Sequence, residues 1–124
     1  MKRAIREPYP LFDAHGQVRA WHRGNWLYSQ EGEPIAVILG EGIFRVSGRL
    51  IGFIKGENLL DLQGLIIAAP DRGGALCVPV AQPRRFDYTP AVVPRDPVRP
   101  RPISKYMWSL ASWEDWFTSR DRGR

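Results

Sequence analysis

Glycine recurs at an interval of sixteen residues through the first half of the chain, and this period constrains the fold more than any other feature of the sequence. In every copy, the residues five and four positions before the glycine are apolar or aromatic, and the residue four positions after it is small. Regular self-similarity of this kind indicates a chain built from repeated structural units. The four glycines are Gly16, Gly32, Gly48 and Gly64, and the small residues are Ala20, Ala36, Gly52 and Ala68.

Each unit has the sequence pattern of a β-hairpin. An apolar pair is followed by a short polar stretch, the glycine and a second apolar run, which is typical of two strands joined by a tight loop. Glycine suits such a loop because one loop residue usually needs a positive φ, which other residues adopt at a steric cost. A further glycine, at Gly24, Gly40 and Gly56, marks the next chain reversal. The pattern therefore predicts about eight strands over residues 9–72, including 18–21, 35–39, 50–54 and 65–69 directly after the four loops.

Four such units are expected to close on themselves. A closed ring hides the strand edges at which open sheets aggregate, and each unit is much shorter than the roughly 40 residues of a propeller blade. We therefore predict an all-β fold of four pseudo-repeated hairpins around a pseudo-four-fold axis, with a small eight-stranded barrel as the alternative. The four small residues in register indicate that the copies converge at a crowded central axis.

The second half of the chain has a different character. Seven prolines fall within residues 79–102, and because proline fixes φ and removes a backbone donor, we expect an extended strap there. Ser112, with Asp115 three residues later, resembles a capping box and predicts a short helix at about 112–120. The expected organisation is a repeat domain at 9–81, a strap at 82–103 and an aromatic segment at 104–124.

The aromatic segment contains the candidate partner-binding residues. On a helix, Trp113, Trp116 and Phe117 share one face because they are three and four residues apart. This face either packs on the chain's own body and completes its core, or binds another protein or a second copy of the chain. A small β body is marginally stable alone, which favours packing on the same chain or on a symmetric neighbour. The candidate residues are Trp108, Trp113, Trp116 and Phe117.

The glycine hairpins of residues 9–72, together with the segment Trp-Ser-Leu-Ala-Ser-Trp-Glu-Asp-Trp-Phe at 108–117, resemble the four-fold β-flower family. Members of this family are small, mostly bacterial proteins. The resemblance implies four similar β units arranged about a pseudo-four-fold axis. It implies no assigned activity, cofactor or catalytic residue.

A ring of equivalent polar positions, three residues before each glycine, is a candidate for chemistry because the four side chains could converge on an axial pocket. Asp13 together with His15 would suit a pair of orienting carboxylate and general base. Polar residues at hairpin tips are nevertheless expected without any function. We therefore predict no catalytic, cofactor or metal site. The ring consists of Asp13, Ser29, Arg45 and Asp61.

The net charge of +5 comes from the two ends of the chain, since residues 9–81 are nearly neutral. Nucleic-acid-binding domains gather Lys and Arg on one face, so nucleic acid is not the favoured partner. We expect a non-enzymatic structural or protein-interaction module, homo-oligomeric or bound to a protein partner through its aromatic segment. The alternatives are a binder of nucleic acid or another anionic surface through the basic termini, and a small-ligand binder at the polar ring.

Composition also bears on location. The single cysteine, Cys77, gives no disulfide framework, and we expect a buried thiol in an edge or closing strand at 75–79. The sequence has no run of 18 apolar residues, and no apolar segment of a signal peptide follows the basic N-terminus. We expect a cytoplasmic protein without a membrane span.

Overall fold

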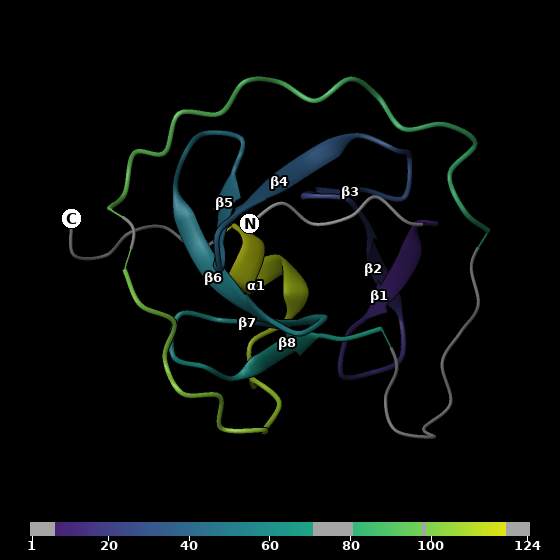
Figure 1. The fold of residues 1–124 in the computed structure, drawn as a ribbon. Coiled ribbons are helices and arrows are strands. Elements are labelled where there is room, and N and C mark those ends of the chain that lie inside the picture. The colour runs from purple at the N-terminus through teal and green to yellow at the C-terminus, as the bar shows by residue number, and fades with distance from the viewer. Residues whose placement is uncertain (1–6, 71–80, 98, 119–124) are drawn as a thin grey trace.

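The described part of the chain is a ring of antiparallel strands around a short helix (Figure 1). The structure is a computed structural model, and it describes residues 7–70, 81–97 and 99–118. These residues form eight strands and one helix. The elements are β1 (Tyr9–Phe12), β2 (Val18–Arg23), β3 (Trp26–Tyr28), β4 (Pro34–Leu39), β5 (Gly42–Arg45), β6 (Leu50–Lys55), β7 (Asn58–Leu60), β8 (Ile66–Ala68) and α1 (Trp113–Phe117).

The strands form one sheet in sequence order, in which each strand pairs with the next. The sheet closes on itself because Phe12, at the end of β1, exchanges backbone hydrogen bonds with Ala69, just after β8. The Phe12 N–H donates to the Ala69 carbonyl at 2.8 Å, and the Ala69 N–H donates back at 3.0 Å. Closure pairs the two edges that an open sheet would leave free. The predicted all-β fold is confirmed, and the ring of hairpins and the small barrel prove to be the same closed sheet.

Each glycine hairpin contains the same irregularity. In the β1–β2 pair, Leu11 lies opposite Ala20 but Phe12 lies opposite Val18, so Arg19 is an extra residue on β2. The same shift occurs at the equivalent position of the β3–β4, β5–β6 and β7–β8 pairs. A bulge bends its strand and increases the local twist, so four equivalent bulges help to turn the sheet into a ring. The extra residues are Arg19, Ile35, Ile51 and Ile67.

Two kinds of turn alternate around the ring, and both depend on glycine at positive φ, as predicted. The longer loops within the repeats have their glycine at φ between 80° and 95°. The two-residue loops between repeats begin with a glycine at φ between 61° and 63°, as in a type II′ turn. The glycines of the longer loops are Gly16, Gly32, Gly48 and Gly64, and those of the two-residue loops are Gly24, Gly40 and Gly56.

The apolar pair before each glycine supplies two separate cores, because consecutive strand residues point to opposite faces of a sheet. The first member of each pair lies in the inner core together with Ala20, Ala36 and Ala68, all fully buried, which confirms the crowded interior. The second member lies in one of two outer clusters. The inner residues are Leu11, Leu27, Ile43 and Leu59, and the outer residues are Phe12, Tyr28, Phe44 and Leu60.

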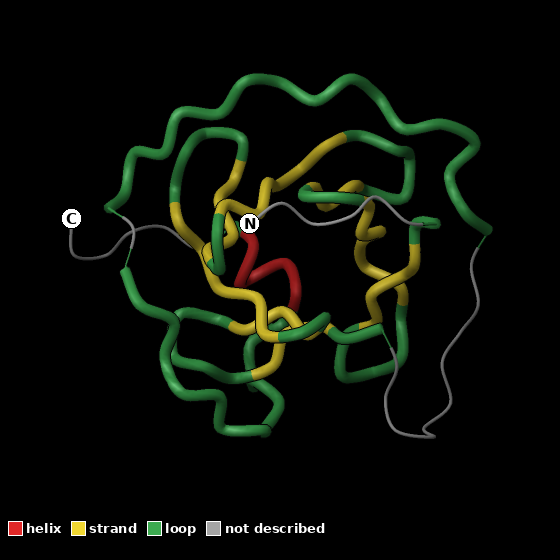
Figure 2. Tube along the Cα trace, viewed as in Figure 1, coloured by secondary structure: helices red, strands yellow, loops and turns green. Residues whose placement is uncertain are grey.

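The C-terminal half of the chain completes both cores. Its extended part runs around the outside of the sheet, and α1 lies inside the ring (Figure 2). The Ser112 side chain accepts a hydrogen bond from the Asp115 N–H at 3.0 Å, so the predicted helix start is confirmed. The observed helix ends at Phe117, with Thr118 as its C-cap. The molecule therefore has three concentric layers, a central helix, a closed sheet and an outer strap.

The observed strands differ from the predicted ones at their ends. The strand predicted at 18–21 extends to Arg23, because pairing with β3 continues up to the two-residue turn. Cys77 and the strand expected around it lie outside the described residues, as do the last two residues of the predicted helix.

Candidate functional site

The four ring positions serve the turns in which they lie. In each repeat the backbone N–H of the ring residue donates to the residue four positions later, and its carbonyl accepts from the glycine, with N···O distances between 2.7 and 3.1 Å. Asp13 and Asp61 each also accept two loop amides through one carboxylate oxygen. The Ser29 hydroxyl accepts the equivalent pair of amides at 3.2 Å. These side chains stabilise their loops, as polar residues at hairpin tips commonly do.

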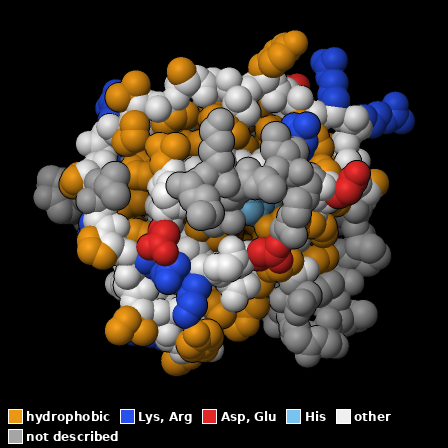
Figure 3. Space-filling model, in the orientation of Figure 1, with side chains coloured by type: hydrophobic (Ala, Val, Ile, Leu, Met, Phe, Trp, Pro, Cys, Tyr) orange, Lys and Arg blue, Asp and Glu red, His pale blue; other side chains and the backbone are white. Residues whose placement is uncertain are grey.

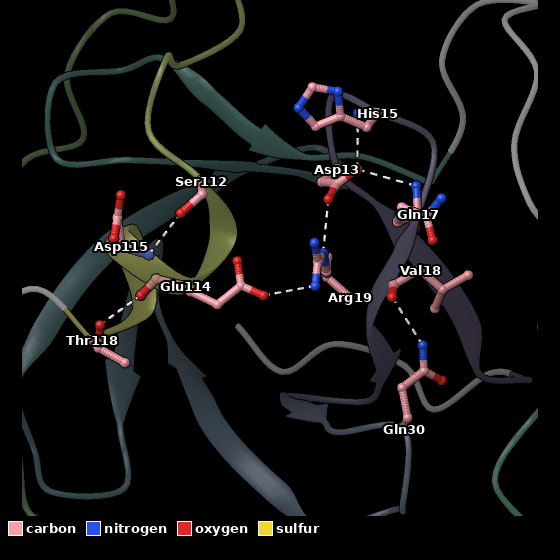
Figure 4. A network of polar contacts seen from close by, with 10 residues as sticks. All are labelled: Asp13, His15, Gln17, Val18, Arg19, Gln30, Ser112, Glu114, Asp115 and Thr118. Carbon is pink, nitrogen blue, oxygen red and sulfur yellow. Dashed lines mark hydrogen bonds and ion pairs between the residues drawn. The ribbon is translucent and has the colours of Figure 1, made fainter.

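The side chain of Asp13 is linked to α1 through Arg19 (Figure 4). Its second carboxylate oxygen binds Arg19 Nε at 2.7 Å, and Arg19 Nη1 lies 2.7 Å from a Glu114 carboxylate oxygen. Burial raises the pKa of Asp13, but hydrogen bonds from Arg19 and from the Gln17 and His15 amides outweigh burial and bring this pKa below its ordinary value. The contact of Asp13 with His15 uses the main-chain N–H of His15.

The interior of the ring is occupied by Trp116 of α1. Its side chain is 5% exposed and packs in the inner core with Ile51 and Ile67, while Ile35 packs against the same cluster. The indole N–H donates to the Ile51 carbonyl at 2.8 Å. A Cβ on Gly52 would lie 3.1 Å from the Trp116 ring and 2.2 Å from a backbone oxygen of the neighbouring strand. Glycine therefore replaces alanine in the third repeat because a backbone and an indole ring approach it closely.

Two arginines from opposite repeats hold the two ends of α1. Arg19, in the first repeat, contacts Glu114 in the first turn of the helix. Arg45, in the third repeat, donates from Nη1 to the Phe117 carbonyl at 3.1 Å, at the last helical residue. A cation at the C-terminal end of a helix stabilises the helix, because it interacts favourably with the last carbonyl groups, which have no partner within the helix. Arg45 is therefore a ring residue that contacts the helix. Its side chain does not form a shared site with those of Asp13, Ser29 and Asp61.

The strap, which in the structure continues beyond residue 103 to Ala111, binds the sheet through its backbone. The N–H groups of Asp87, Arg95 and Lys105 donate to the carbonyls of Gly32, Gly48 and Gly64 at 2.9, 2.7 and 3.2 Å. Two residues before each donor, a strap carbonyl lies so close to the glycine that a Cβ there would be 2.1, 2.3 or 2.6 Å away. Three repeats therefore hold the strap in an equivalent way, although its sequence has no matching period. The carbonyls belong to Arg85, Val93 and Ile103.

The predicted partner-binding aromatics separate into two places. Trp113, Trp116 and Phe117 pack together, with ring centroids 5.0 to 6.2 Å apart, against the inner core. Trp108 packs on an outer cluster and forms a parallel bridge with Ile66 beside β8. The aromatic segment therefore packs on the chain's own body. In this arrangement the four residues do not share one binding surface.

Several residues that shape these contacts were absent from the predicted site. Arg19 occupies the position of Ile35, Ile51 and Ile67 in the other repeats, and alignment of the units would have singled it out as the polar exception. For another of these contacts the sequence contains no indication. Lys55 donates to the Tyr106 hydroxyl at 2.7 Å, and this bond lowers the pKa of Tyr106. The two residues are far apart in sequence and belong to no repeat pattern.

Two further observations concern metal binding and membrane-spanning helices. Among residues 7–70, 81–97 and 99–118, no group of three His, Cys, Asp or Glu side chains is arranged to hold a metal ion. Within the same residues, no helix has the length and apolar character needed to cross a membrane.

Comparison with known proteins extends the structural description. A family model described as "4-fold beta flower protein" matches residues 9–117, which include the eight strands, the strap and α1. No curated protein and no solved structure matches the chain.

Proposed function

We propose that this chain, which belongs to the 4-fold beta flower family, is a non-enzymatic protein-interaction module. The strap is the interacting element, and the ring with its central helix is the scaffold that holds it. One observation carries this proposal. The backbone of the strap is fixed on three repeats, while apolar side chains on its outer side are exposed.

The fixed backbone matters because ordering a flexible segment on binding costs free energy. A segment held in place before the partner arrives avoids most of that cost, so its exposed side chains contribute more fully to affinity. Strap residues Val93 and Ile103 are 78% and 89% exposed, and each has its own carbonyl packed on a glycine of the ring. An exposed apolar side chain on an element that is already ordered enters an interface without the cost of ordering that element.

The two alternative functions have less support. The described residues carry equal numbers of acidic and basic side chains, so a binder of nucleic acid or another anionic surface would have to act through other parts of the chain. A small-ligand binder at the polar ring would have to share the interior with Trp116 and the arginines that hold α1. We also propose a cytoplasmic location, which the single cysteine supports.

Site-specific photo-crosslinking in cells that express the full chain tests the proposed function. A photoreactive amino acid at Val93 or Ile103 is expected to give covalent adducts with protein, because both side chains point away from the ring. The matched control is Gln17, which is exposed in a loop of the ring. Absence of protein adducts from both strap positions, or equal adducts from Gln17, would contradict the proposal.

A mobility-shift titration with DNA and RNA oligonucleotides tests the alternative that the protein binds nucleic acid. Binding through phosphate contacts weakens steeply as salt rises. We expect no shift at moderate salt. A shift that persists there, together with crosslinks to nucleic acid, would replace the proposed function by the anionic-surface alternative.

A further inference from the structure

The strap exposes most of its large apolar side chains beside the fourth repeat. Ile103 and Tyr106 are 89% and 72% exposed, and Met107 and Leu110 are also exposed. Leu62, in the loop between β7 and β8, is 39% exposed. We call this surface the Tyr106 patch, and it consists of Leu62, Ile103, Tyr106, Met107 and Leu110.

Backbone contacts place the members of the patch together. The Lys105 N–H donates to the Gly64 carbonyl at 3.2 Å, and its ammonium group donates to the Gln63 carbonyl at 2.8 Å. Leu62 precedes these two loop residues directly. The Ile66 N–H then donates to the Met107 carbonyl at 2.7 Å, which fixes the next part of the strap to β8. Figure 1 shows the strap passing along the β7–β8 loop, and Figure 3 shows exposed hydrophobic side chains on that side of the molecule.

Tyr106 is held in an unfavourable backbone conformation. Among the described residues it is the one non-glycine residue with positive φ, at 53°. Such a conformation is uncommon for a bulky residue and persists only where surrounding contacts impose it. Here Lys55 donates to the hydroxyl, and its ammonium group also lies 4.7 Å from the ring centroid. These contacts fix the position of an aromatic ring that remains largely exposed.

Lys55 and Lys105 place two ammonium groups beside the patch, and Asp61, which directly precedes Leu62, places one carboxylate there. The Lys55 ammonium donates to a neutral hydroxyl, and the Lys105 ammonium donates to a neutral carbonyl. Neither of these bonds compensates the charge of the lysine. An apolar surface with two ammonium groups at its rim is complementary to apolar side chains flanked by carboxylates.

We propose that the Tyr106 patch binds a protein segment in which apolar side chains are flanked by Asp or Glu. This inference rests on the proposed function and specifies the kind of partner. A second copy of the chain fits less well. In a two-fold dimer the same patch lies on both sides of the interface, so the ammonium groups of Lys55 and Lys105 from both copies would enter one interface.

Selection of a random twelve-residue peptide library on the immobilised full chain tests the proposal. We expect enrichment of peptides in which Leu, Ile, Phe or Trp stands beside Asp or Glu. The best peptide is then labelled and titrated against the full chain by fluorescence polarisation. Enrichment of basic or uncharged peptides, or no enrichment, would overturn the proposal.

Variants identify the surface that binds the selected peptide. Tyr106→Ala and Met107→Ser are expected to weaken binding at least tenfold, as removal of a central contact commonly does. Lys55→Gln and Lys105→Gln are expected to weaken it about threefold to tenfold at low salt and less at high salt. Val46→Ser, in the loop between β5 and β6, is the matched control, because Val46 is exposed on a part of the ring to which no binding role is assigned, and it should leave binding unchanged. Equal binding by all four patch variants would refute the proposal even if the peptides are acidic.

The result of the peptide-binding test can be distinguished from the result of the photo-crosslinking test of the proposed function. If photo-crosslinking yields protein adducts from Val93 but the patch variants retain peptide binding, the strap is an interaction surface and the Tyr106 patch is not its centre. The mass of the native full chain, measured by light scattering, provides the remaining distinction. A dimer that dissociates on Tyr106→Ala would assign the patch to a second copy and overturn the choice of an acidic partner.

Discussion

The loop glycines of the second, third and fourth repeats meet two independent requirements. Each has a positive φ, which favours glycine for any turn of this shape. Each also packs against a strap carbonyl at a distance that leaves no room for a side chain. Gly40 meets only the first requirement, because nothing lies within 4 Å of a Cβ built on it. The chain thus contains its own control for separating the two effects.

We expect Gly48→Ala to be more destabilising than Gly40→Ala. Both variants place a methyl group at positive φ, which costs about 1–2 kcal/mol. In Gly48→Ala the Cβ would also lie 2.3 Å from the Val93 carbonyl oxygen, so the strap must move as well. Chemical denaturation of both variants measures the difference. Equal free energies of unfolding would mean that the strap contributes nothing to stability at Gly48.

Asp13 and Asp61 form a second matched pair. Both carboxylates accept two loop amides, but Asp13 also binds Arg19, where the fourth repeat has Ile67. The first repeat therefore departs from the four-fold pattern through a charged contact that extends to α1. This difference predicts a pH dependence specific to Asp13.

Asp13→Asn is expected to lower the free energy of unfolding at neutral pH by on the order of 1–2 kcal/mol. The pKa of Asp13 lies below its unfolded value of about 3.9. Its ionised form therefore adds stability above that value, and the added stability is lost as pH falls through the folded pKa. Denaturation at several pH values should show the difference between the wild type and Asp13→Asn shrinking below about pH 4. A constant difference, or an equal loss in Asp61→Asn, would contradict this assignment.

At the scale of elements, α1 depends on the ring for its existence. A helix of five residues is far too short to form alone in water. It is stabilised by Trp116 in the inner core and by Arg19 and Arg45 at its two ends. The strap has the same dependence, because its prolines prevent a regular ladder and three of its N–H groups bind the loop glycines.

Trp116→Ala is expected to destabilise the protein by about 3–5 kcal/mol, the usual cost of removing a large buried aromatic side chain. Trp113→Ala is the comparison, since Trp113 lies in the same helix but is only partly buried. It should cost clearly less. Denaturation followed by circular dichroism measures both values. A similar small effect from the two substitutions would show that α1 does not complete the core.

At the scale of the whole molecule, the sheet is buried on both faces. The inner face packs on α1 and the outer face packs on the strap through residues such as Phe86 and Trp108. A sheet of this size cannot bury both faces with its own side chains. The C-terminal half is therefore a structural part of the ring, and its exposed outer side is the surface that remains for a partner.

A chain that ends at residue 81 is expected to lose stability and to aggregate, because both apolar faces of the sheet become exposed. Its melting temperature and its mass in solution are the measurements. The full chain with Gly40→Ala serves as a control for a modest loss of stability without loss of a layer. A truncated chain that remains monomeric with an unchanged melting temperature would mean that the ring is self-sufficient.

Local patterns predicted most of the fold. The positive-φ glycines, the paired apolar residues before them and the Ser112 cap are each set by sterics or hydrogen bonds within a few residues, and the structure contains all of them. The candidate site was harder to predict from the sequence. The aromatic set proved to lie on two different layers, because residues as close as Trp108 and Trp113 can face different cores once the chain passes the edge of the ring.

The sequence by itself determined the repeat, its strands and its turns, because a period of sixteen residues imposes the same short-range geometry four times. Only the tertiary structure decided where the nonperiodic half would lie. Its contacts with the ring join residues distant in sequence, such as Lys55 with Tyr106 and Arg19 with Glu114. Such contacts depend on where the strap and α1 lie on the closed sheet, which no local pattern specifies.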